Sequence, residues 1–524
     1  MAHLMLPLTL RAAPAGALLV AALTIGGCAS LPPLDGRTPS TALTETAGTK
    51  LGKAVIAADR PREDESGIYS LPQGRDAFAA RVVLARAAER SLDVQYYIWH
   101  ADTTGFLLLE EIWNSAERGV RVRMLLDDNG IKGLDPILAV FDAHPNIEVR
   151  LYNPYPNRGF KPLGYLTHFK RLNRRMHNKS FTADTQLTIV GGRNVGDEYF
   201  GAGEGTLFAD LDVVAVGRVA GEVAAAFDLY WNSDSAYPAD GIVGKPAPDG
   251  VAALKSRLAA VHASPEAAEY LQAVRETRLV ESLLTHELRF DWSCVELLYD
   301  PPGKTLGGSD QEDLLLADLK RAVGEPLREL DIVSPYFVPG KTGTKNLSAY
   351  PESGIELRIV TNSFAATDVG AVHAGYSKRR KALLRSGTRL YELKPNAPED
   401  GAPSGAPPKK SAGSSTASLH GKTLQVDRSR VFVGSFNLDP RSANLNTEMG
   451  LMIDSPQLAG ALSDWVDRVP QTVAYEVILT PDGGLEWIEL TDQGEVRYHH
   501  DPKVGFLKRL LARIIGWLPI ESLL

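Results

Sequence analysis

The sequence predicts a duplicated α/β domain in which helices cover a mostly parallel sheet. Three observations support this fold class. Short apolar strands alternate with helical stretches such as 76–90 and 311–323, a pattern typical of βαβ units. The strand segments recur about 240 residues later in the chain, and a group of polar residues recurs with them. The length of 524 residues is therefore explained by one domain present twice.

Three pairs of strand-like segments define the repeat. Each pair shares an apolar pattern and turn residues, as in LDVQYY against LDIVSPY and GVRVRMLL against GIELRIV. The paired segments are 91–97 with 330–336, 119–126 with 354–360, and 146–154 with 387–395. Because the pairs follow the same order in both halves, the two copies are expected to share one topology.

The composition excludes several classes of protein. With 44% hydrophobic and 23% charged residues and only 2 Cys, the chain is neither disordered nor a disulfide scaffold. The net charge of −8 argues against a general nucleic-acid binder. An anionic substrate must therefore be attracted by a local cluster of cations.

The N-terminus predicts export and a lipid anchor. Residues 1–27 read as a lipoprotein signal peptide, because an apolar run ends in Ile-Gly-Gly before Cys28, which resembles a bacterial lipobox. Cys28 would then carry the lipid on a membrane facing the periplasm, and the Ala-Ser that follows favours the outer membrane. An ordinary signal peptide cut nearby is the alternative. Residues 28–66 are predicted to be a flexible tether with a short helix at 51–58.

The C-terminal segment 503–518 predicts a basic amphipathic helix. Its apolar residues have helical spacing, and Lys503, Lys508, Arg509 and Arg513 fall largely on the opposite side. Such a helix suits a bilayer interface, where cations meet anionic head groups. A helix that packs its apolar face on the protein body explains the same pattern, and both interpretations remain open.

The expected domain organisation follows from the repeat and from changes in composition. Between the copies, Cys294 is interpreted as a buried thiol in a strand. The predicted parts are domain 1 at 67–245, a helical connector and strand at 246–300, domain 2 at 301–480 with a mobile loop at 396–416, and a hairpin with the amphipathic helix at 481–524.

A polar motif in each copy carries the chemistry. The runs HNKSFTAD and GGRN in the first copy recur as HGKTLQVD and GSFN, with the same internal spacing. His-x-Lys places both side chains on one face of a strand. Lys and Asn offer donors to phosphate oxygens, and His can attack phosphorus or move a proton, so phosphoryl chemistry needs no metal or other cofactor here. The candidate residues are His177, Lys179, Asp184 and Asn194 in the first copy, and His420, Lys422, Asp427, Ser435 and Asn437 in the second.

The doubled motif resembles the phospholipase D superfamily, and stretches such as LDVQYYIWHADTTG and IVGGRNVGDEYFG resemble bacterial cardiolipin synthases of the C type. The resemblance extends from Gly67 to the C-terminus, apart from the low-complexity loop. It implies two pseudo-symmetric α/β/α domains with mixed, mostly parallel sheets and one active site at their interface. His177 would be the nucleophile and His420 the general acid and then base, and the reverse assignment remains open.

The resemblance also implies a carboxylate behind each histidine. Alignment of the strand LDVVAV with TEMGLM assigns Asp212 to His177 and Glu448 to His420. Asp184 and Asp427 are expected to brace the motif rather than touch substrate. Gly192 occupies the position of Ser435, so a hydroxyl contact to phosphate is expected from one side only.

The activity implied is the synthesis of cardiolipin from phosphatidylglycerol and a second phospholipid through a phosphatidyl-histidine. A hydrolytic phospholipase D is the main alternative, and a nuclease or a non-catalytic lipoprotein is less favoured. The expected partners are phospholipid substrates and a membrane surface, with no nucleic acid and no obligate protein partner.

Overall fold

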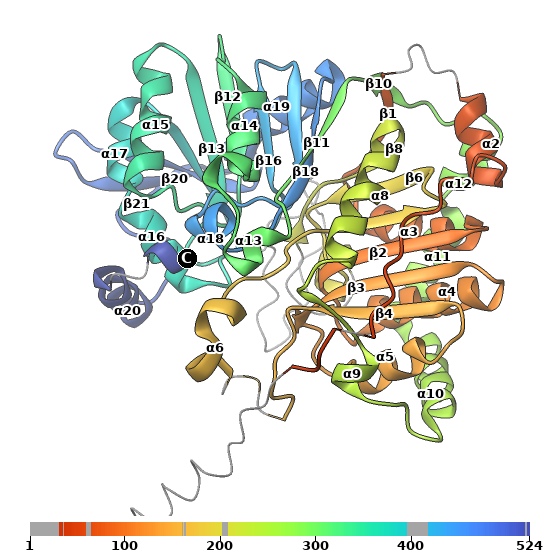
Figure 1. Cartoon of the computed structure of the whole chain (residues 1–524). Coiled ribbons are helices and arrows are strands. Elements are labelled where there is room, and N and C mark those ends of the chain that lie inside the picture. Colours follow the sequence, from red (N-terminus) through yellow and green to blue (C-terminus); the bar gives the residue numbers. More distant parts are fainter. Residues whose placement is uncertain are drawn as a thin grey trace, which may run out of the picture.

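A computed structural model describes residues 31–34, 36–58, 64–159, 161, 164–201, 208–395, 418–518 and 521–524. These residues form two units that lie side by side, each built around one large sheet (Figure 1). The predicted signal peptide, Cys28 and the predicted loop 396–416 lie outside the described residues.

The first unit contains a nine-stranded sheet. Its strands, in spatial order, are β10 (Asp291–Ser293), β1 (Ser66–Leu71), β8 (Asp212–Gly217), β6 (Leu187–Gly191), β5 (Ser180–Ala183), β2 (Ser91–Ile98), β3 (Arg121–Gly130), β4 (Ile147–Tyr152) and β9 (Ala236–Pro238). Helices α3 (Gly74–Ala87), α4 (Thr103–Glu117) and α5 (Asp135–Asp142) cover one face, and α8 (Arg218–Trp231) covers the other. Alternate valines of β8 enter these two cores, as the period of a strand requires.

The second unit repeats this plan with ten strands. In spatial order they are β11 (Val295–Tyr299), β18 (Met449–Ile453), β17 (Arg430–Gly434), β16 (Thr423–Val426), β12 (Glu329–Val333), β13 (Glu356–Asn362), β14 (Arg389–Leu393), β19 (Ala474–Leu479), β20 (Leu485–Thr491) and β21 (Gly494–Tyr498). Helices α14 (Leu315–Val323), α15 (Gly340–Glu352) and α17 (Arg380–Ser386) lie on one face, and α19 (Pro456–Thr472) lies on the other.

Shorter helices complete the described parts of the chain. They are α6 (Gly164–Leu172), α7 (Asp197–Phe200), α9 (Asp240–Val243), α13 (Gly303–Leu306), α16 (Gly370–Ser377), α18 (Pro440–Asn444) and the 3-10 turns Gln311–Asp313 and Glu521–Leu523. Helix α20 (Phe506–Trp517) lies at the C-terminal end, beside α16. None of the described helices combines the length and the apolar character needed to cross a bilayer.

The sheets are mixed, as predicted, but parallel pairing is the minority arrangement among the described strands. It is confined to β2–β3–β4 and β12–β13–β14, and the other neighbours within the two sheets are antiparallel. The reason is that the motif strands form tight hairpins, β5–β6 and β16–β17. Their turns use left-handed residues, Asp184 and Thr185 in the first hairpin and Asp427 and Arg428 in the second.

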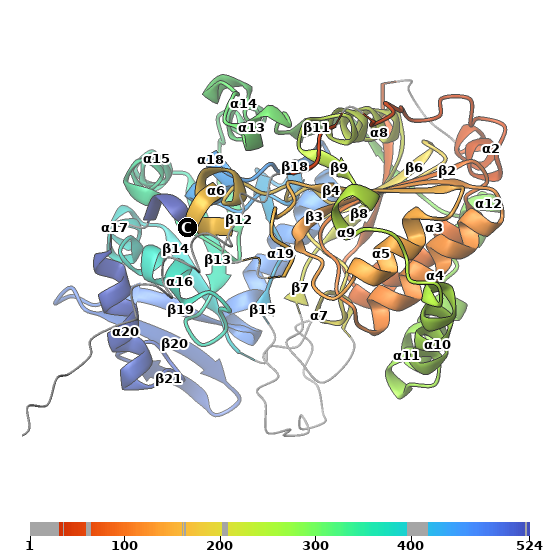
Figure 2. The same ribbon diagram turned by 60° about the horizontal axis from the view of Figure 1, so that its bottom comes forward.

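The two units share an apolar core. Val190 and Val213 of the first sheet pack in one cluster with Val433, Met449 and Leu451 of the second. The strands that carry this core contact one another where the two sheets meet (Figure 2), β17 with β6 and β8, and β18 with β6. Strands β6 and β17 end at Gly191 and Gly434, the first glycines of the GGRN and GSFN runs. The motif residues are therefore positioned by a packed interface rather than by loops alone.

Residues 31–58 are packed on the first unit, so the predicted flexible tether is wrong for this part. The Arg37 guanidinium donates to the carbonyl oxygens of Asn232 at 2.8 Å and Ala236 at 3.1 Å, and also to that of Ser233. Helix α2 (Lys50–Ala57), which the sequence indicated, buries Leu51 completely. The Arg37 hydrogen bonds satisfy backbone carbonyl groups just after α8 that would otherwise need water.

The predicted connector 246–300 divides between the two units. Helices α10 (Gly250–His262), α11 (Pro265–Glu276) and α12 (Leu279–Leu284) pack on α3, α4 and α5 of the first unit. The chain then crosses between the sheets at Cys294, which is exposed, so the prediction of a buried thiol is wrong. Its neighbours Ser293 and Val295 are buried, and alternation turns the side chain between them outward.

We expect Arg37→Ala to lower the free energy of unfolding of the first unit by about 1–3 kcal/mol, because several hydrogen bonds to a guanidinium are lost. Protease cleavage within residues 31–58 should become faster. Urea denaturation and limited proteolysis measure both effects. Arg75→Ala is the matched control, since Arg75 and Glu269 are 54% and 60% exposed and their ion pair should contribute less than about 1 kcal/mol. An equal response of the two variants would contradict the packing of this segment.

Candidate active site

Each histidine motif pairs with the opposite unit. The His177 amide donates to the Thr447 carbonyl oxygen at 2.8 Å, and the Thr447 amide donates to the Arg175 carbonyl oxygen at 2.9 Å. In the equivalent place, β15 (Ser418–Leu419) lies parallel to β7 (Phe208–Ala209). Two short parallel ladders therefore cross the interface and bring the motifs together.

The carboxylates behind the imidazoles also come from the opposite unit. Nδ1 of His177 lies 2.7 Å from Oε2 of Glu448. Nδ1 of His420 lies 2.6 Å from Oδ2 of Asp210. All four side chains are buried. Each pair can hold its imidazole in the tautomer with a proton on Nδ1, which leaves the Nε2 lone pair for chemistry.

The predicted pairing of Asp212 with His177 and of Glu448 with His420 is therefore wrong. Asp212 instead pairs with Arg81 at 2.8 Å. The strand register explains the error, since Gly191 lies opposite Asp212 in the first copy and Gly434 lies opposite Gly450 in the second. Asp212 thus corresponds to position 450, and Asp210 corresponds to Glu448. A slip of two residues keeps every side chain on its original face, so the apolar pattern alone does not reveal it.

The difference between Gly192 and Ser435 follows from these carboxylates. A Cβ at Gly192 would lie 2.2 Å from Oδ1 of Asp210, so a larger residue here would displace the carboxylate that holds His420. Ser435 instead donates to Oε2 of Glu448 at 2.5 Å and accepts from the Met449 amide at 3.0 Å. The Ser435 hydroxyl is thus engaged with a carboxylate, and the expected contact to phosphate is not supported.

The two lysines lie against the imidazoles. Nζ of Lys179 donates to the His177 carbonyl oxygen at 2.5 Å, and Nζ of Lys422 lies 3.1 Å from Nε2 of His420. Burial lowers the pKa of Lys179 well below its usual value and lowers that of Lys422 to about 8. Each lysine also lowers the charge of the other by repulsion, and an anion between them would restore it.

Both histidines are neutral near pH 7. Burial is the main cause that lowers the pKa of His177 to about 4 and that of His420 to about 3, against the opposing effect of the carboxylates. Although burial raises the pKa of Glu448, its contacts with His177 and Lys179 hold it below the usual value. A neutral imidazole beside an ionised carboxylate is the form that a nucleophile or general base requires.

Tyrosine rings close the site. The Tyr97 ring lies 5.0 Å from that of His177, and the Tyr199 ring lies 5.1 Å from that of His420. Neither these rings nor Asp210 were identified from the sequence. Tyr97 is the last residue of the predicted strand 91–97, and Asp210 points to the same side of its strand as Asp212, so both signals were present but weak.

The remaining motif residues support the backbone. Asp184 accepts from the amides of Arg90 at 2.7 Å and Ser91 at 3.0 Å, where β2 begins. Asp427 makes the equivalent bonds to the amides of Leu327, Arg328 and Glu329. Both carboxylates therefore lie at the far ends of their strands from the lysines and brace the hairpins.

The two asparagines of the motif are both buried. Asn194 accepts the Ile98 amide at 3.1 Å and so ties the first motif to the end of β2. Asn437 follows β17 at the corresponding place in the second unit. Their amides are thus positioned at the ends of the strands that approach the interface.

One group of side chains in the described ranges has the spacing of a metal site, His100 with Asp102 and Glu198. Nδ1 of His100 lies 3.0 Å from Glu198, and Asp102 caps α4 through the Gly105 amide. All three are partly exposed, and none contacts the motif histidines. In the motif site, by contrast, the carboxylates of Glu448 and Asp210 are each paired with an imidazole.

Comparison with a solved structure supports the fold. Phosphatidylserine synthase from Haemophilus influenzae Rd KW20 superposes with a TM-score of 0.54 at 15% sequence identity, over 91% of this chain and 100% of that one. At this identity the likeness concerns the fold alone. It agrees with the arrangement of two sheet-based units.

Sequence comparisons are more specific. Cardiolipin synthase C of Escherichia coli K12 is 43% identical over 476 residues, which cover 91% of this chain and 100% of the relative. A cardiolipin synthase of Staphylococcus aureus is 24% identical over 419 residues, covering 78% and 67% of the two chains. The family model described as "Cardiolipin synthase, PLD-like domain" matches residues 83–231 and 315–469, one match in each unit. The chain therefore belongs to the phospholipase D-like cardiolipin synthase family.

Proposed function

We propose that the chain is a phosphatidyltransferase that makes cardiolipin from phosphatidylglycerol and a second phospholipid. The observation that carries this proposal is the pair of neutral, carboxylate-held imidazoles, one from each unit, beside two buried lysines. The 43% identity to a cardiolipin synthase supports the choice of substrate class. The chemistry that these groups support is displacement at a phosphodiester.

The first step forms a phosphatidyl-histidine. Nε2 of His177 attacks the phosphorus of the donor lipid, and the P–O bond to the headgroup alcohol breaks. His420, protonated when the substrate is bound, gives its proton to the leaving oxygen. Lys179 and Lys422 neutralise the charge on the phosphoryl oxygens as it develops.

The second step returns the enzyme to its starting state. His420 takes the proton from a glycerol hydroxyl of phosphatidylglycerol, whose oxygen attacks phosphorus while the P–N bond to His177 breaks. Cardiolipin leaves. His177 is again neutral and His420 again carries the proton, as at the start of the cycle. The tyrosine rings and the packed interface limit water at the phosphorus, which favours an alcohol as acceptor.

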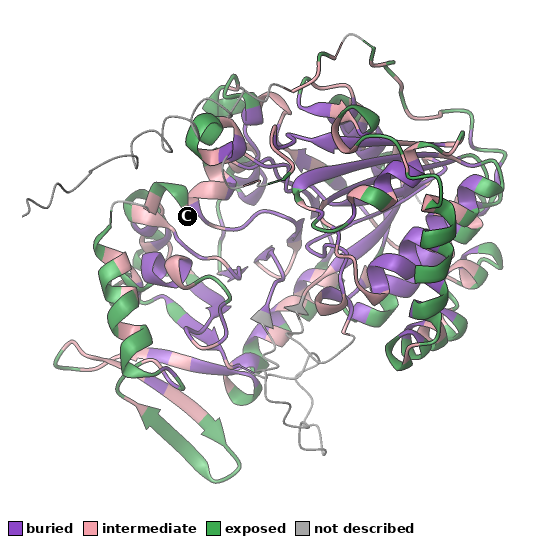
Figure 3. Ribbon diagram, turned by 90° about the horizontal axis from the view of Figure 1, so that it is seen from below, coloured by how far each residue is buried: buried purple, intermediate pink, exposed green. Residues whose placement is uncertain are grey.

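Attachment to a membrane completes the proposal. Cys28 carries the lipid anchor of an exported protein, facing the periplasm, with the outer membrane as the favoured location. Helix α20 supports membrane contact, because its apolar residues are open to solvent: Leu507 is 76%, Leu511 56% and Ile514 47% exposed. In Figure 3 no part of this helix is coloured as buried. In water such an apolar stripe is normally covered by the rest of the protein, whereas at a bilayer interface it can insert among the lipids.

We expect the purified chain in vesicles of phosphatidylglycerol to form cardiolipin, and His177→Ala to reduce the rate by at least about 10³-fold, because the covalent intermediate is lost. Mass spectrometry of the lipids measures the products. Cys294→Ser, at an exposed position between the units, serves as the control and should retain activity. Formation of phosphatidic acid without cardiolipin would overturn the synthase assignment in favour of a hydrolase.

Loss of the carboxylate behind each imidazole should slow the reaction strongly. We expect Glu448→Gln and Asp210→Asn to lower kcat by about 10²–10⁴-fold, because the imidazolium loses its partner. Asp212→Asn distinguishes the alignment of Asp212 with Glu448 from that of Asp210 with Glu448. It breaks the buried pair with Arg81 and should cost about 3–5 kcal/mol of stability, while kcat of the folded fraction falls less than about tenfold. A larger loss of kcat in Asp212→Asn than in Asp210→Asn would contradict the register.

Anion binding should be linked to proton uptake. The pKa of His420 is about 3 in the free site, and a phosphate-like anion beside it must raise that pKa for the histidine to act as an acid. Where one proton is taken up, affinity falls about tenfold per unit rise in pH. Calorimetry of tungstate binding in buffers of different ionisation enthalpy measures the uptake. His420→Ala should lower the uptake by about one proton and His177→Ala should leave it unchanged, since uptake by Lys179 and Lys422 is common to both variants. The opposite pattern would reverse the two roles.

A further inference from the structure

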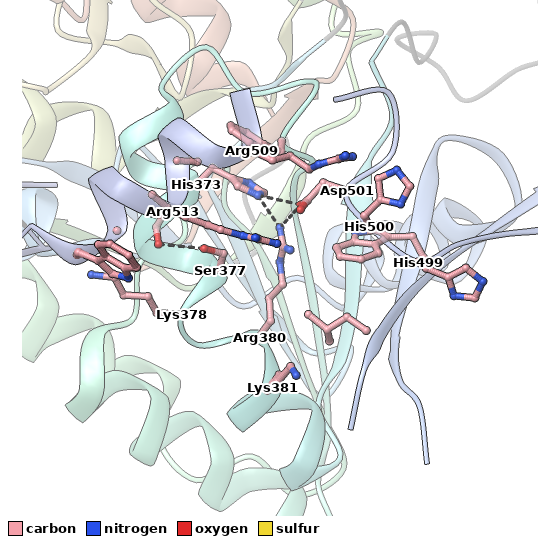
Figure 4. A pocket seen from close by; sticks show the side chains of 17 residues that line it. His373, Ser377, Lys378, Arg380, Lys381, His499, His500, Asp501, Arg509 and Arg513 are labelled. Atoms are coloured by element: carbon pink, nitrogen blue, oxygen red, sulfur yellow. Dashed lines mark hydrogen bonds and ion pairs between the residues drawn. The ribbon is translucent and has the colours of Figure 1, made fainter. Parts of the chain in front are cut away.

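A second cationic cavity lies away from the histidines, between α20 and the second unit. It has a volume of about 440 Å³ and opens beside the exposed face of α20. None of its lining residues belongs to the motif site. The charged and imidazole side chains that line it are His373, Lys378, Arg380, Lys381, His499, His500, Asp501, Arg509 and Arg513 (Figure 4).

The orientation of α20 is the reverse of that in an ordinary surface helix. Arg509, Ala512, Arg513 and Gly516 have the spacing of one helical face, and this face lines the cavity. Leu507 and Leu511, on the other side, are 76% and 56% exposed. The helix thus turns cations toward the protein and apolar side chains away from it.

At this point α20 lies against helix α16, with room between the two helices for a side chain. A Cβ at Gly516 would lie 3.7 Å from Cε of Lys378 and 4.0 Å from the Ala374 carbonyl oxygen, on the neighbouring helix α16. No residue of α20 is buried. Apolar burial therefore does not hold the basic face of α20 toward the cavity.

The protein balances the charges around the cavity only in part, and Lys378 lies 3.8 Å from Glu521. Five lining residues are Lys or Arg, and one, Asp501, is a carboxylate. Asp501 lies 2.9 Å from Arg380, which also pairs with Glu392 at 2.9 Å. Among the described residues, neither Arg509 nor Arg513 forms an ion pair. Like charges brought together in this way indicate an anionic ligand.

The deeper wall of the cavity is rigid. His373 is buried, stacks on Phe364 with ring centroids 4.4 Å apart, and lies 2.6 Å from Arg380. Lys508 of α20 donates to the Phe364 carbonyl oxygen at 3.1 Å. Because Arg380 is already paired with Asp501 and Glu392, the cations left for a phosphate are those at the rim, above all Arg509 and Arg513.

We propose that this cavity binds the headgroup phosphate of an anionic phospholipid while α20 lies in the surface of the same bilayer. The inference rests on the proposed membrane attachment but not on the reaction. The apolar face of α20 reaches the acyl region, and Arg509 and Arg513 meet the phosphate at the level of the headgroups. The chain thus has a lipid-phosphate site that is separate from the one that holds its substrates.

Photo-crosslinking of the full chain tests this proposal. The chain is reconstituted in phosphatidylcholine vesicles that contain a few per cent of phosphatidylglycerol with a photoreactive headgroup, and crosslinked peptides are identified by mass spectrometry. We expect crosslinks at residues 373–381 and 499–517. The double variant Arg509→Gln/Arg513→Gln should reduce their yield by about thirtyfold, since each cation near an anionic surface contributes about a factor of five.

The controls separate this site from the active site. Crosslinks near Tyr97 and Tyr199 report the substrate site in the same sample, so their absence would count against the proposed function and leave this inference intact. Arg275→Gln/Arg278→Gln, at exposed positions in or next to α11 of the first unit, should change nothing. Arg513→Gln alone provides a milder variant if the double change disturbs folding.

Three results would overturn the inference. One is an equal yield at 373–381 with the same photoreactive group on phosphatidylcholine, which would mean that the anionic headgroup is not recognised. Another is complete displacement by inorganic phosphate at millimolar concentration, which would indicate a site for a soluble anion. The third is a yield unchanged by the arginine substitutions.

Discussion

The two histidine–carboxylate pairs that cross the interface are the constraint on which the rest of the structure depends. Glu448 holds His177 and Asp210 holds His420, so neither unit by itself contains a histidine together with the carboxylate that holds it. The buried charges balance in the same way, because two lysines and two carboxylates meet only when the units dock. A separated unit would leave a lysine and a carboxylate without their partners, and such burial is costly. Duplication in one chain keeps the halves together.

The pseudo-symmetry of the two units is broken where Gly192 of the first unit corresponds to Ser435 of the second. In the first unit the shorter Asp210 occupies the space that a side chain at Gly192 would need, with 2.2 Å between Oδ1 and an added Cβ. In the second unit the longer Glu448 is held by the Ser435 hydroxyl. The two imidazoles therefore have different surroundings although their motifs match, and His420 has the lower pKa of the two. Different surroundings allow the two histidines to take different roles in one cycle.

The sequence was sufficient for the duplicated fold and for the motif residues, because both leave periodic signals. It failed where the answer depends on contacts between the copies. The crossing of Glu448 to His177 is a property of docking, and the two-residue error at Asp212 preserved every inside–outside assignment. The prevalence of antiparallel pairs was missed because β5–β6 and β16–β17 are short hairpins hidden inside the motif. The packing of Arg37 on the end of α8 depends on carbonyl groups that no sequence pattern reports.

Transfer to an alcohol rather than to water requires the acceptor to be present at high effective concentration. A bilayer meets this requirement, since phosphatidylglycerol is concentrated in two dimensions at its surface. Under the proposed membrane attachment, α20 places the second unit against such a surface, with apolar side chains outward and Arg509 and Arg513 inward. Residues 31–58 are fixed to the first unit, so any anchor preceding them also holds that unit close to the membrane. Under the same proposal one bilayer holds both units, and the interface that contains the histidines lies close to the lipid that it uses.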